Sequence, residues 1–166
     1  MSQRTFGRIM TSLAAIVFLV VHASSAQRVS RGALSAQDEA KIAALIKAFD
    51  EAINKGDVEG SLAPYAEDAE TFGLLVFKFT NMAERRRAAQ EAVRTSRVQV
   101  VRTMEPRIRV LGNWAWAYWT WRSETEDKQT GRRSSLEGRT TFILEKRNGQ
   151  WKVVHSHISA PFVLGR

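Results

Sequence analysis

The apolar positions near the start of the chain follow a helical pattern. They recur every three or four residues, the spacing of one helix face, at Ile42, Leu45, Ile46, Phe49 and Ile53. This spacing predicts a helix from about residue 35 to Gly56, since glycine often ends a helix. Asp57 can cap a second, short helix that Pro64 disrupts. The segment therefore predicts two helices in succession.

Later in the chain, strand patterns replace the helical spacing. A strand is expected over residues 71–80, and Asn81 can cap a helix that runs to about Arg94. The rest favours strands, in the runs SRVQVV, RIRVLG, WAWAYWTWRSE, RRSSLEGRTTFILEK and QWKVVHSHIS. Asn148-Gly149 separates the last two and is a strong hairpin signal. Helices followed by such strands predict an α+β domain, with the helices on one side of a curved, mostly antiparallel sheet.

The N-terminal segment has the layout of a secretory signal. Arg4 and Arg8 precede a short apolar run, and small residues lead up to Ala26. We therefore expect a signal peptide over 1–26, a polar lead-in over 27–34 and one domain over 35–166. Export to a bacterial periplasm or beyond follows, with no stable membrane insertion after cleavage. The chain contains no cysteine, so it has neither a disulfide framework nor a thiol nucleophile.

Charge narrows the classes of partner. The net charge of +8 falls to about +6 without the two arginines of the signal. The basic residues are scattered, and the one dense run, Arg85 to Arg87, lies on an expected helix. We interpret that run as a solvated helix face rather than a nucleic-acid patch, and export also argues against nucleic acid as a partner.

Two segments resemble a known family. The stretch AALIKAFDEAINKGDVEGSLAPYAEDAETFG (43–73) and the closing run GRTTFILEKRNGQWKVVHSHIS (138–159) are similar to SnoaL-like domains of the nuclear transport factor two-like superfamily. The resemblance implies a cone-shaped α+β roll, with a pocket between the helices and the concave face of the sheet. It also implies a homodimer as the common assembly. Function does not follow from this fold, because it carries several enzyme classes and many binding proteins.

The ketosteroid isomerases of this superfamily provide one test. Their mechanism needs an aspartate general base and a tyrosine donor, and the matching positions here hold Gly73 and Phe49. Neither side chain can move a proton, so this mechanism is not expected. In the Tyr-x-x-Asp-Ala motif, Tyr65 is a candidate pocket residue, and Asp68 is interpreted as a turn or capping residue.

His155 and His157 stand two residues apart in an expected strand and therefore share one face. A two-residue loop at Asn148-Gly149 would place His155 opposite Phe142 and His157 opposite Thr140. A three-residue loop that includes Arg147 would place them opposite Thr141 and Arg139, and Ser159 opposite Glu137. We favour the three-residue loop because it separates polar from apolar positions. The polar set Arg139, Thr141, His155, His157 and Ser159 would then line the pocket.

This polar set admits three chemistries. A metal site would need a third ligand that the mature chain supplies only as a carboxylate, and Arg139 would oppose the cation, so we expect neither metal nor cofactor. Acid–base catalysis would use His155 or His157 as general base, with Arg139 stabilising an anion. Ligand binding without chemistry would use the same side chains as the polar end of a pocket.

The aromatic stretch NWAWAYWTW (113–121) predicts a strand that meets apolar surroundings on both faces. Alternation places Trp114, Trp116 and Tyr118 on one face, and it places Ala115, Ala117, Trp119 and Trp121 on the other. One face would pack on the helices or line the pocket. The other would expose large rings unless a second subunit covers it.

These observations lead to one main hypothesis and two alternatives. The main hypothesis is an exported protein that binds a small molecule, with Tyr65, Trp116 and Trp119 as candidate walls beside Arg139, Thr141 and the two histidines. The first alternative is an isomerase, cyclase or hydrolase that uses a histidine general base on a small anionic or carbonyl substrate. The second is a protein-interaction module that uses the Trp114, Trp116 and Tyr118 face.

Overall fold

The computed structural model describes residues 35–74, 78 and 81–161. The expected signal peptide (1–26) and polar lead-in (27–34) lie outside these residues. The chain divides into two units between residues 38 and 39, and the fold described below belongs to the second, apart from residues 35–38 at the start of the first helix. Within the described part, no helix is both long and apolar enough to cross a membrane.

The first two helices form as the apolar spacing predicts. The first spans residues 35–55 and ends at Gly56, whose φ of 67° is a conformation that glycine adopts without strain. α2 follows at Val58–Leu62. Its N-cap is Asp57, whose side chain accepts a hydrogen bond from the Gly60 N–H at 2.9 Å. The expected residues therefore end one helix and begin the next.

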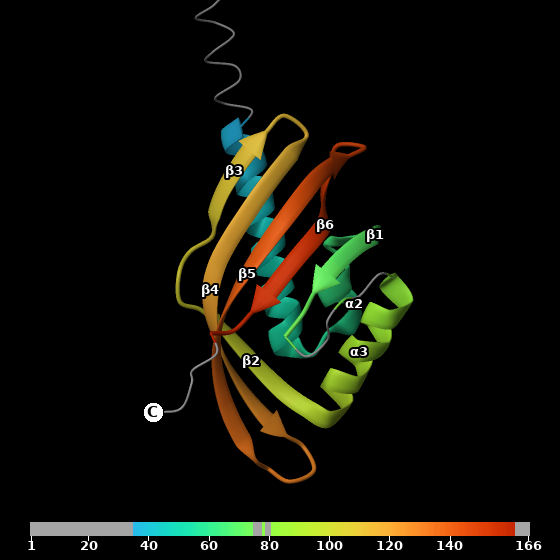
Figure 1. Cartoon of the computed structure of the whole chain (residues 1–166), viewed down its shortest axis with the longest axis vertical. Helices are drawn as coiled ribbons and strands as arrows, with labels where there is room; N and C mark the ends of the chain where they lie inside the picture. Colours follow the sequence, from blue (N-terminus) through green and yellow to red (C-terminus); the bar gives the residue numbers. More distant parts are fainter. Residues whose placement is uncertain (1–34, 75–77, 79–80, 162–166) are drawn as a thin grey trace, which may run out of the picture. The chain divides into compact units, whose positions relative to one another are not determined.

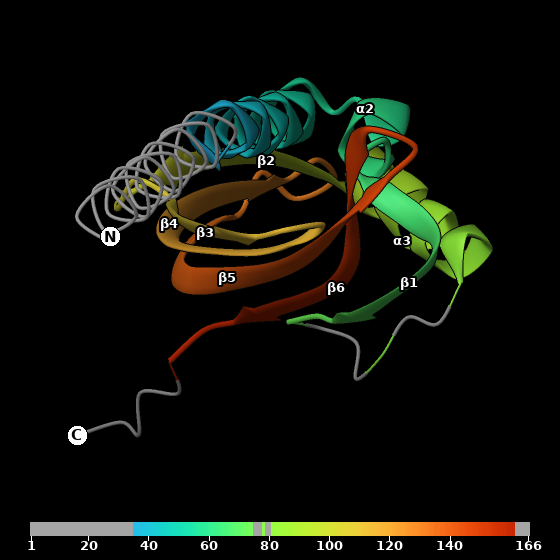
Figure 2. The ribbon, with the colours of Figure 1, turned by 90° about the horizontal axis from the view of Figure 1, so that it is seen from above.

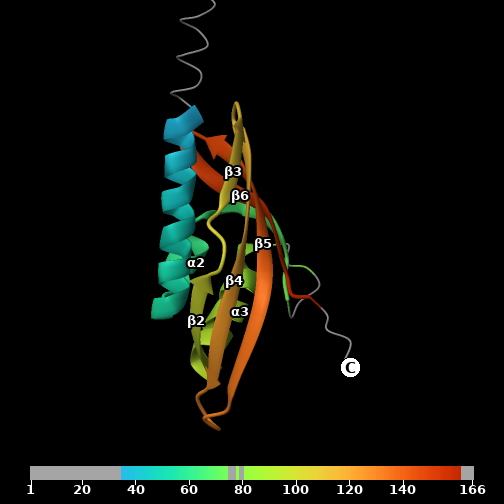
Figure 3. The same cartoon turned by 90° about the vertical axis from the view of Figure 1, so that its left-hand side faces the viewer.

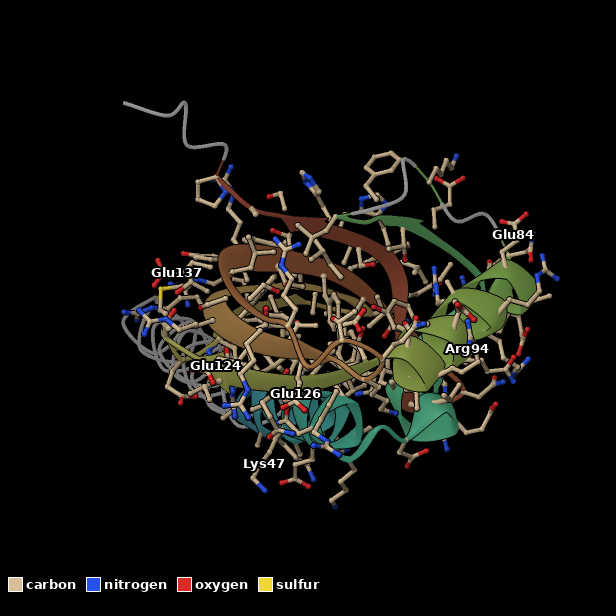
Figure 4. All side chains as sticks on the ribbon, turned by 90° about the horizontal axis from the view of Figure 1, so that it is seen from below. Lys47, Glu84, Arg94, Glu124, Glu126 and Glu137 are labelled. Carbon is tan, nitrogen blue, oxygen red and sulfur yellow. The ribbon has the colours of Figure 1, made fainter. Side chains whose placement is uncertain are left out.

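α3 spans Met82–Thr95 and also begins where expected. The Asn81 side chain accepts a hydrogen bond from the Glu84 N–H at 2.9 Å, which satisfies one free donor of the first turn. Glu84 and Arg94 mark the two ends of this helix (Figure 4). Asp57 and Asn81, both read from the sequence, thus determine where α2 and α3 start.

The described strands form one sheet in the order β1-β6-β5-β4-β2, and β3 pairs with β4 as well (Figure 1). β1 pairs with β6 in parallel and all other pairs are antiparallel. The strands are β1 (Tyr65–Phe72), β2 (Ser96–Arg102), β3 (Arg107–Leu111), β4 (Trp114–Asp127), β5 (Arg133–Arg147) and β6 (Gln150–Ser159). This is the α+β architecture that the sequence predicts.

The first strand lies earlier than expected. The prediction of a strand over 71–80 was wrong at the described residues 73, 74 and 78, because β1 covers Tyr65–Phe72; residues 75–77, 79 and 80 lie outside the described part. Its sequence, YAEDAETF, is poor in β-branched residues, but parallel pairing with β6 and burial of Tyr65, Ala69 and Thr71 outweigh that weak propensity. Asp68 accordingly lies within a strand and not in a turn.

The helices lie on one side of the curved sheet (Figures 2 and 3). The first helix runs along one face, which we call the inner face, and α3 contacts β1 and β2. The opposite face is called the outer face. The core fills the space between the first helix and the inner face, where Ile46, Phe142 and Val153 are fully buried. The concave face of the sheet therefore serves mainly as packing surface along the first helix.

Gly138 on β5 shows why one position of the closing motif requires glycine. It pairs with Trp121 of β4, and a Cβ atom at residue 138 would lie 2.2 Å from the Trp121 ring. The missing side chain lets the indole cross β5, where Trp121 Nε1 donates to Thr140 Oγ1 at 3.0 Å. A buried tryptophan thus has its N–H satisfied within the core.

Candidate functional site

The residues that the sequence predicts as one site lie on two different faces of the sheet. Tyr65 and Trp119 lie on the inner face, where they are buried in the core. The other candidates lie on the outer face, where the side chains are exposed or half-buried: Trp116, Arg139, Thr141, His155 and His157. A pocket on either face could therefore hold only part of the predicted set.

The hairpin register differs from the favoured one. Arg147 pairs with Gln150, so the loop is the two residues Asn148 and Gly149, with φ values of 50° and 79°. Positive φ at both positions is typical of the tight turn that matches the twist of paired strands. The favoured three-residue loop was therefore wrong.

A bulge restores the grouping of polar residues despite this loop. The register shifts between Ile143 and Leu144, which places His157 opposite Thr141, His155 opposite Ile143 and Arg139 opposite Ser159. This register differs from the favoured one by two residues, an even number, so the same side chains still share a face. Arg139 Nε donates to Ser159 Oγ at 3.0 Å.

The histidines belong to an open aromatic surface. The Phe72 ring meets His155 and His157 edge-on, with centroids 5.3 and 6.2 Å apart. Beside them lie apolar side chains that are 38 to 50% exposed. Together with the histidines they form the outer aromatic patch: Phe72, Trp114, Trp116, Tyr118, Ile143, His155 and His157. The patch is an exposed apolar surface that carries the two histidines.

The inner face carries a buried polar cluster between β1, β6 and α3. Thr71 Oγ1 and Ser156 Oγ lie 2.8 Å apart, and Arg85 donates to Thr71 Oγ1 at 2.5 Å. Burial raises the pKa of Tyr65, an effect that Ser156 and the nearby Arg85 oppose. The cluster Tyr65, Thr71, Arg85 and Ser156 is thus a connected set of polar groups within an apolar core.

Arg85 corrects the interpretation of the basic run. Arg86 pairs with Glu59 at 2.8 Å and Arg87 is exposed, as a solvated helix face requires. Arg85, in contrast, is only 6% exposed. Met82, three residues earlier, is also buried, so helical spacing from Met82 was the signal that could have placed Arg85 on the inner side.

Asp50 on the first helix is a second buried charge. Its Oδ2 lies 3.0 Å from Arg102 Nε, without the alignment of a hydrogen bond. Burial raises the pKa of Asp50 to about 6; Arg102 opposes this rise and Glu105 adds to it. Asp50 can therefore exchange a proton near neutral pH, the property a general acid or base needs. The predicted enzymatic activity with a histidine general base stays a prediction.

A cavity of about 510 Å³ lies where the end of the first helix, α2, α3 and the start of β2 meet. Its walls include the apolar side chains Ala52, Ile53, Ala89, Val93 and Val98. The basic residues Lys55, Arg97 and Lys128 border it, and Asp57 is the one acidic residue of its lining. Arg97 also lies 3.9 Å from Glu126 of the neighbouring groove, so Lys55 and Lys128 are the freer charges. The combination of apolar walls and a basic rim suits an anion with an apolar body.

Asn54 holds one wall of this cavity in place. Its side-chain amide bonds both backbone groups of Val100, with Nδ2 to the carbonyl oxygen at 3.0 Å and Oδ1 from the N–H at 2.6 Å. Gln99 Nε2 donates to the Asn54 carbonyl oxygen at 3.0 Å. These bonds tie the first helix to β2, so the cavity has a fixed side.

An adjoining groove of about 530 Å³ between β2, β4 and β5 is less suited to a ligand. It is lined by Glu124 and Glu126 of β4 (Figure 4) together with Arg97 and Arg133. Arg133 pairs with Glu126 at 3.1 Å, so the charges of the groove largely compensate one another. Neither hollow is lined by Arg139, Thr141, His155 or His157.

The described residues contain no group of three His, Cys, Asp or Glu side chains placed to hold a metal ion. Phe49, at the position of the isomerase tyrosine, packs edge-on against Tyr65 and Phe142 with centroids 6.1 and 5.5 Å away. It serves the core. Gly73 follows directly after β1 and has no side chain to supply a base.

The sequence matches the family model of the SnoaL-like domain over residues 42–163. This chain belongs to the SnoaL-like family. Among curated proteins, none matches the sequence significantly.

Solved structures extend the likeness of this SnoaL-like protein to the nuclear transport factor two-like superfamily. A member of unknown function from Pseudomonas putida is 26% identical, with a TM-score of 0.67, and the match covers 78% of this chain and 91% of that one. A superfamily protein from Salmonella enterica is 19% identical, with a TM-score of 0.71 and coverage of 78% and 95%. A ketosteroid isomerase-like protein from Erwinia carotovora is also 19% identical, with a TM-score of 0.68 and coverage of 75% and 96%. The last two likenesses concern the fold alone.

Proposed function

We propose that this SnoaL-like protein binds a small molecule, an anion with an apolar body, in the cavity between the first helix, α2, α3 and β2. The observation that carries the proposal is the cavity itself, because its volume of about 510 Å³ falls within the range of small-molecule sites. The apolar walls would hold the body of the ligand. Lys55, Arg97 and Lys128 would attract its acidic group.

This proposal moves the ligand away from the residues that the sequence favours. Arg139, Thr141, His155 and His157 face the opposite side of the sheet, and their part in binding or catalysis stays a prediction. Export also stays a prediction, since residues 1–26 lie outside the described part. The volume, the apolar walls and the basic rim of the cavity support binding there.

A matched pair of ligands and a matched pair of variants test the proposal. Isothermal titration would compare naphthalene-2-carboxylate with its neutral carboxamide, and we expect the carboxylate to bind at least tenfold more tightly. Val93→Trp would fill the cavity and abolish binding of both. Val101→Trp, on the exposed side of β2, makes the same change elsewhere and would leave binding unchanged. Equal binding by the wild type and Val93→Trp would place the ligand outside the cavity.

We also propose that a second copy of the chain covers the outer aromatic patch. The patch gathers large apolar side chains on one face, more than isolated exposed residues would explain. On its β3 side lie Arg107 and Arg109, which have no acidic partner among the described residues. On its β1 side lies Glu70, which pairs with Lys78 at 2.7 Å. A two-fold axis along the strands would bring the two sides together, so that Arg107 and Arg109 of one copy would compete with Lys78 for Glu70 of the other.

A further inference from the structure

Arg85 is a buried guanidinium with unused donors. Its Nη2 donates to the Ala69 carbonyl oxygen at 3.2 Å and to Thr71 Oγ1 at 2.5 Å. Its Nε and Nη1 are buried, and neither has a hydrogen-bond partner among the described residues. Buried arginines are almost always paired, because a buried charge without a partner costs several kcal/mol. The unpaired Nε and Nη1 groups of Arg85 therefore indicate a binding site for a hydrogen-bond acceptor.

No acidic side chain of the protein neutralises Arg85. The sequence contains 17 Asp and Glu residues, and every one of them lies in the described part of the chain. None contributes to the electrostatics of Arg85, whose pKa is lowered by burial and raised only by the neighbouring Tyr65. The guanidinium carbon lies 4.1 Å from the Tyr65 ring centroid, a cation–π contact that offsets part of the cost. The charge of Arg85 thus remains without a counter-ion.

The position of Arg85 on α3 adds to the positive potential. The residue belongs to the start of this 14-residue helix, where free N–H groups and the helix dipole favour anions. Glu84, the acidic residue of the first turn, lies at the N-terminal end of α3 (Figure 4) and forms no ion pair with Arg85. Helix terminus and buried guanidinium therefore act in the same direction.

The neighbouring hydroxyl groups hold the guanidinium in position. Thr71 and Ser156 bond one another at 2.8 Å across the β1–β6 pair, and Thr71 also accepts from Arg85. Both side chains are at most 4% exposed. An arginine fixed in this way loses little conformational entropy when an anion arrives. Because Nε and Nη1 are buried, the surrounding groups must shift to admit the anion.

We propose that Arg85 is the centre of an anion site on the inner side of the sheet, which takes an oxyanion group, a carboxylate or a phosphate, of a small ligand. The anion accepts hydrogen bonds from the unused Nε and Nη1 donors and supplies the missing counter-charge. The site shares no residue with the walls of the 510 Å³ cavity. It therefore does not depend on the ligand proposed for that cavity.

The test measures thermal unfolding and the Arg85 side-chain N–H signals by NMR in the full chain. Sodium acetate and sodium phosphate would each be compared with sodium chloride at constant ionic strength. In the wild type, we expect at least one of the two oxyanions to raise Tm by several degrees with a saturating dose dependence and to shift the Arg85 Nε–H signal. Saturation by acetate would identify a carboxylate site, and saturation by phosphate a phosphate site.

Variants separate the site from a structural role. Arg85→Met removes the unneutralised charge, so it should fold and lose the oxyanion response; Arg85→Lys should keep the response with at least tenfold weaker affinity. Arg87→Met, an exposed position on the same helix, should respond like the wild type. The proposal would be overturned if oxyanions raised the Tm of Arg85→Met as much as that of the wild type. It would also be overturned if neither oxyanion raised the Tm of the wild type. Naphthalene-2-carboxylate binding should survive Arg85→Met, which keeps this result independent of the cavity.

Discussion

The two faces of the central sheet use the same kinds of residue for opposite purposes. On β4, Trp119 and Trp121 face the helices and are 2% and 7% exposed, whereas Trp114 and Trp116 face outward and are 50% and 39% exposed. The inner rings pack in a core and find partners within it. The outer rings lie beside the histidines on an open surface. The comparison shows that aromatic content alone does not indicate a ligand pocket, because the layer that covers a face determines what its rings do.

Two adjacent residues on β5 provide the most direct test of the difference between the two faces. Phe142 is fully buried and contacts Phe49 and Trp119, with ring centroids 5.5 and 4.9 Å away, whereas Ile143 faces outward. We expect Phe142→Ala to lower the free energy of unfolding by about 3–5 kcal/mol, because it leaves a cavity in the core. Ile143→Ala should cost about 1 kcal/mol or less in the monomer. Urea unfolding would measure both, and similar losses would contradict the assignment of the two faces.

The buried carboxyl group of Asp50 should make the stability of the protein depend on pH. The pKa of Asp50 is raised from 3.8 to about 6 in the folded state, so the folded protein binds this proton more tightly than the unfolded chain. Stability due to this group is therefore present at low pH and falls as the pH rises through about 6. We expect Asp50→Asn to gain stability relative to the wild type between about pH 4 and pH 7.

A neighbouring carboxyl is the control for this measurement. Glu51 is exposed, and the hydrogen bond from Lys47, together with its charge, lowers the pKa of Glu51. Lys47 itself points away from the sheet (Figure 4). Relative to the wild type, Glu51→Gln should not gain stability as the pH rises, whereas Asp50→Asn should gain it across the same pH series. A difference in unfolding free energy between the wild type and Asp50→Asn that does not change with pH would contradict the raised pKa.

The outer aromatic patch should matter for assembly more than for folding. Trp116→Lys is expected to change monomer stability little, and it should weaken self-association at least tenfold because it places a charge within the contact. Sedimentation velocity over a range of concentrations would measure the effect. Leu136→Lys is a suitable control, since Leu136 is 42% exposed and lies outside the patch. A wild type that stays monomeric throughout the series would refute the proposed contact.

Local signals in the sequence were sufficient for most elements. The N-caps Asp57 and Asn81, the terminator Gly56 and the Asn148-Gly149 turn all act over a few residues, and each lies where the pattern predicts. β1 was misplaced because its stability comes from parallel pairing with β6, more than 80 residues away in the chain. A segment with weak propensity gives no local signal of such a partner.

The candidate site could be read only in part. The sequence placed Arg139, Thr141, His155 and His157 on one face, and the structure agrees, even though the loop and the register differ from those favoured. A register error of an even number of residues keeps the face, which is why that grouping survived. The hollow lined by the first helix, α2, α3 and β2 had no signal of its own, because its walls come from four separate elements.

Local spacing and motifs within single segments were enough to predict most elements other than β1, the alternation along the strands and the membership in the SnoaL-like family. Only the tertiary structure decided which face of the sheet the helices cover, and with it the exposure of the histidines. It also decided that Arg85, and not Arg86 or Arg87, is buried without a counter-charge. The physical reason is that burial depends on contacts between distant elements, while spacing in the sequence specifies only which side chains point the same way.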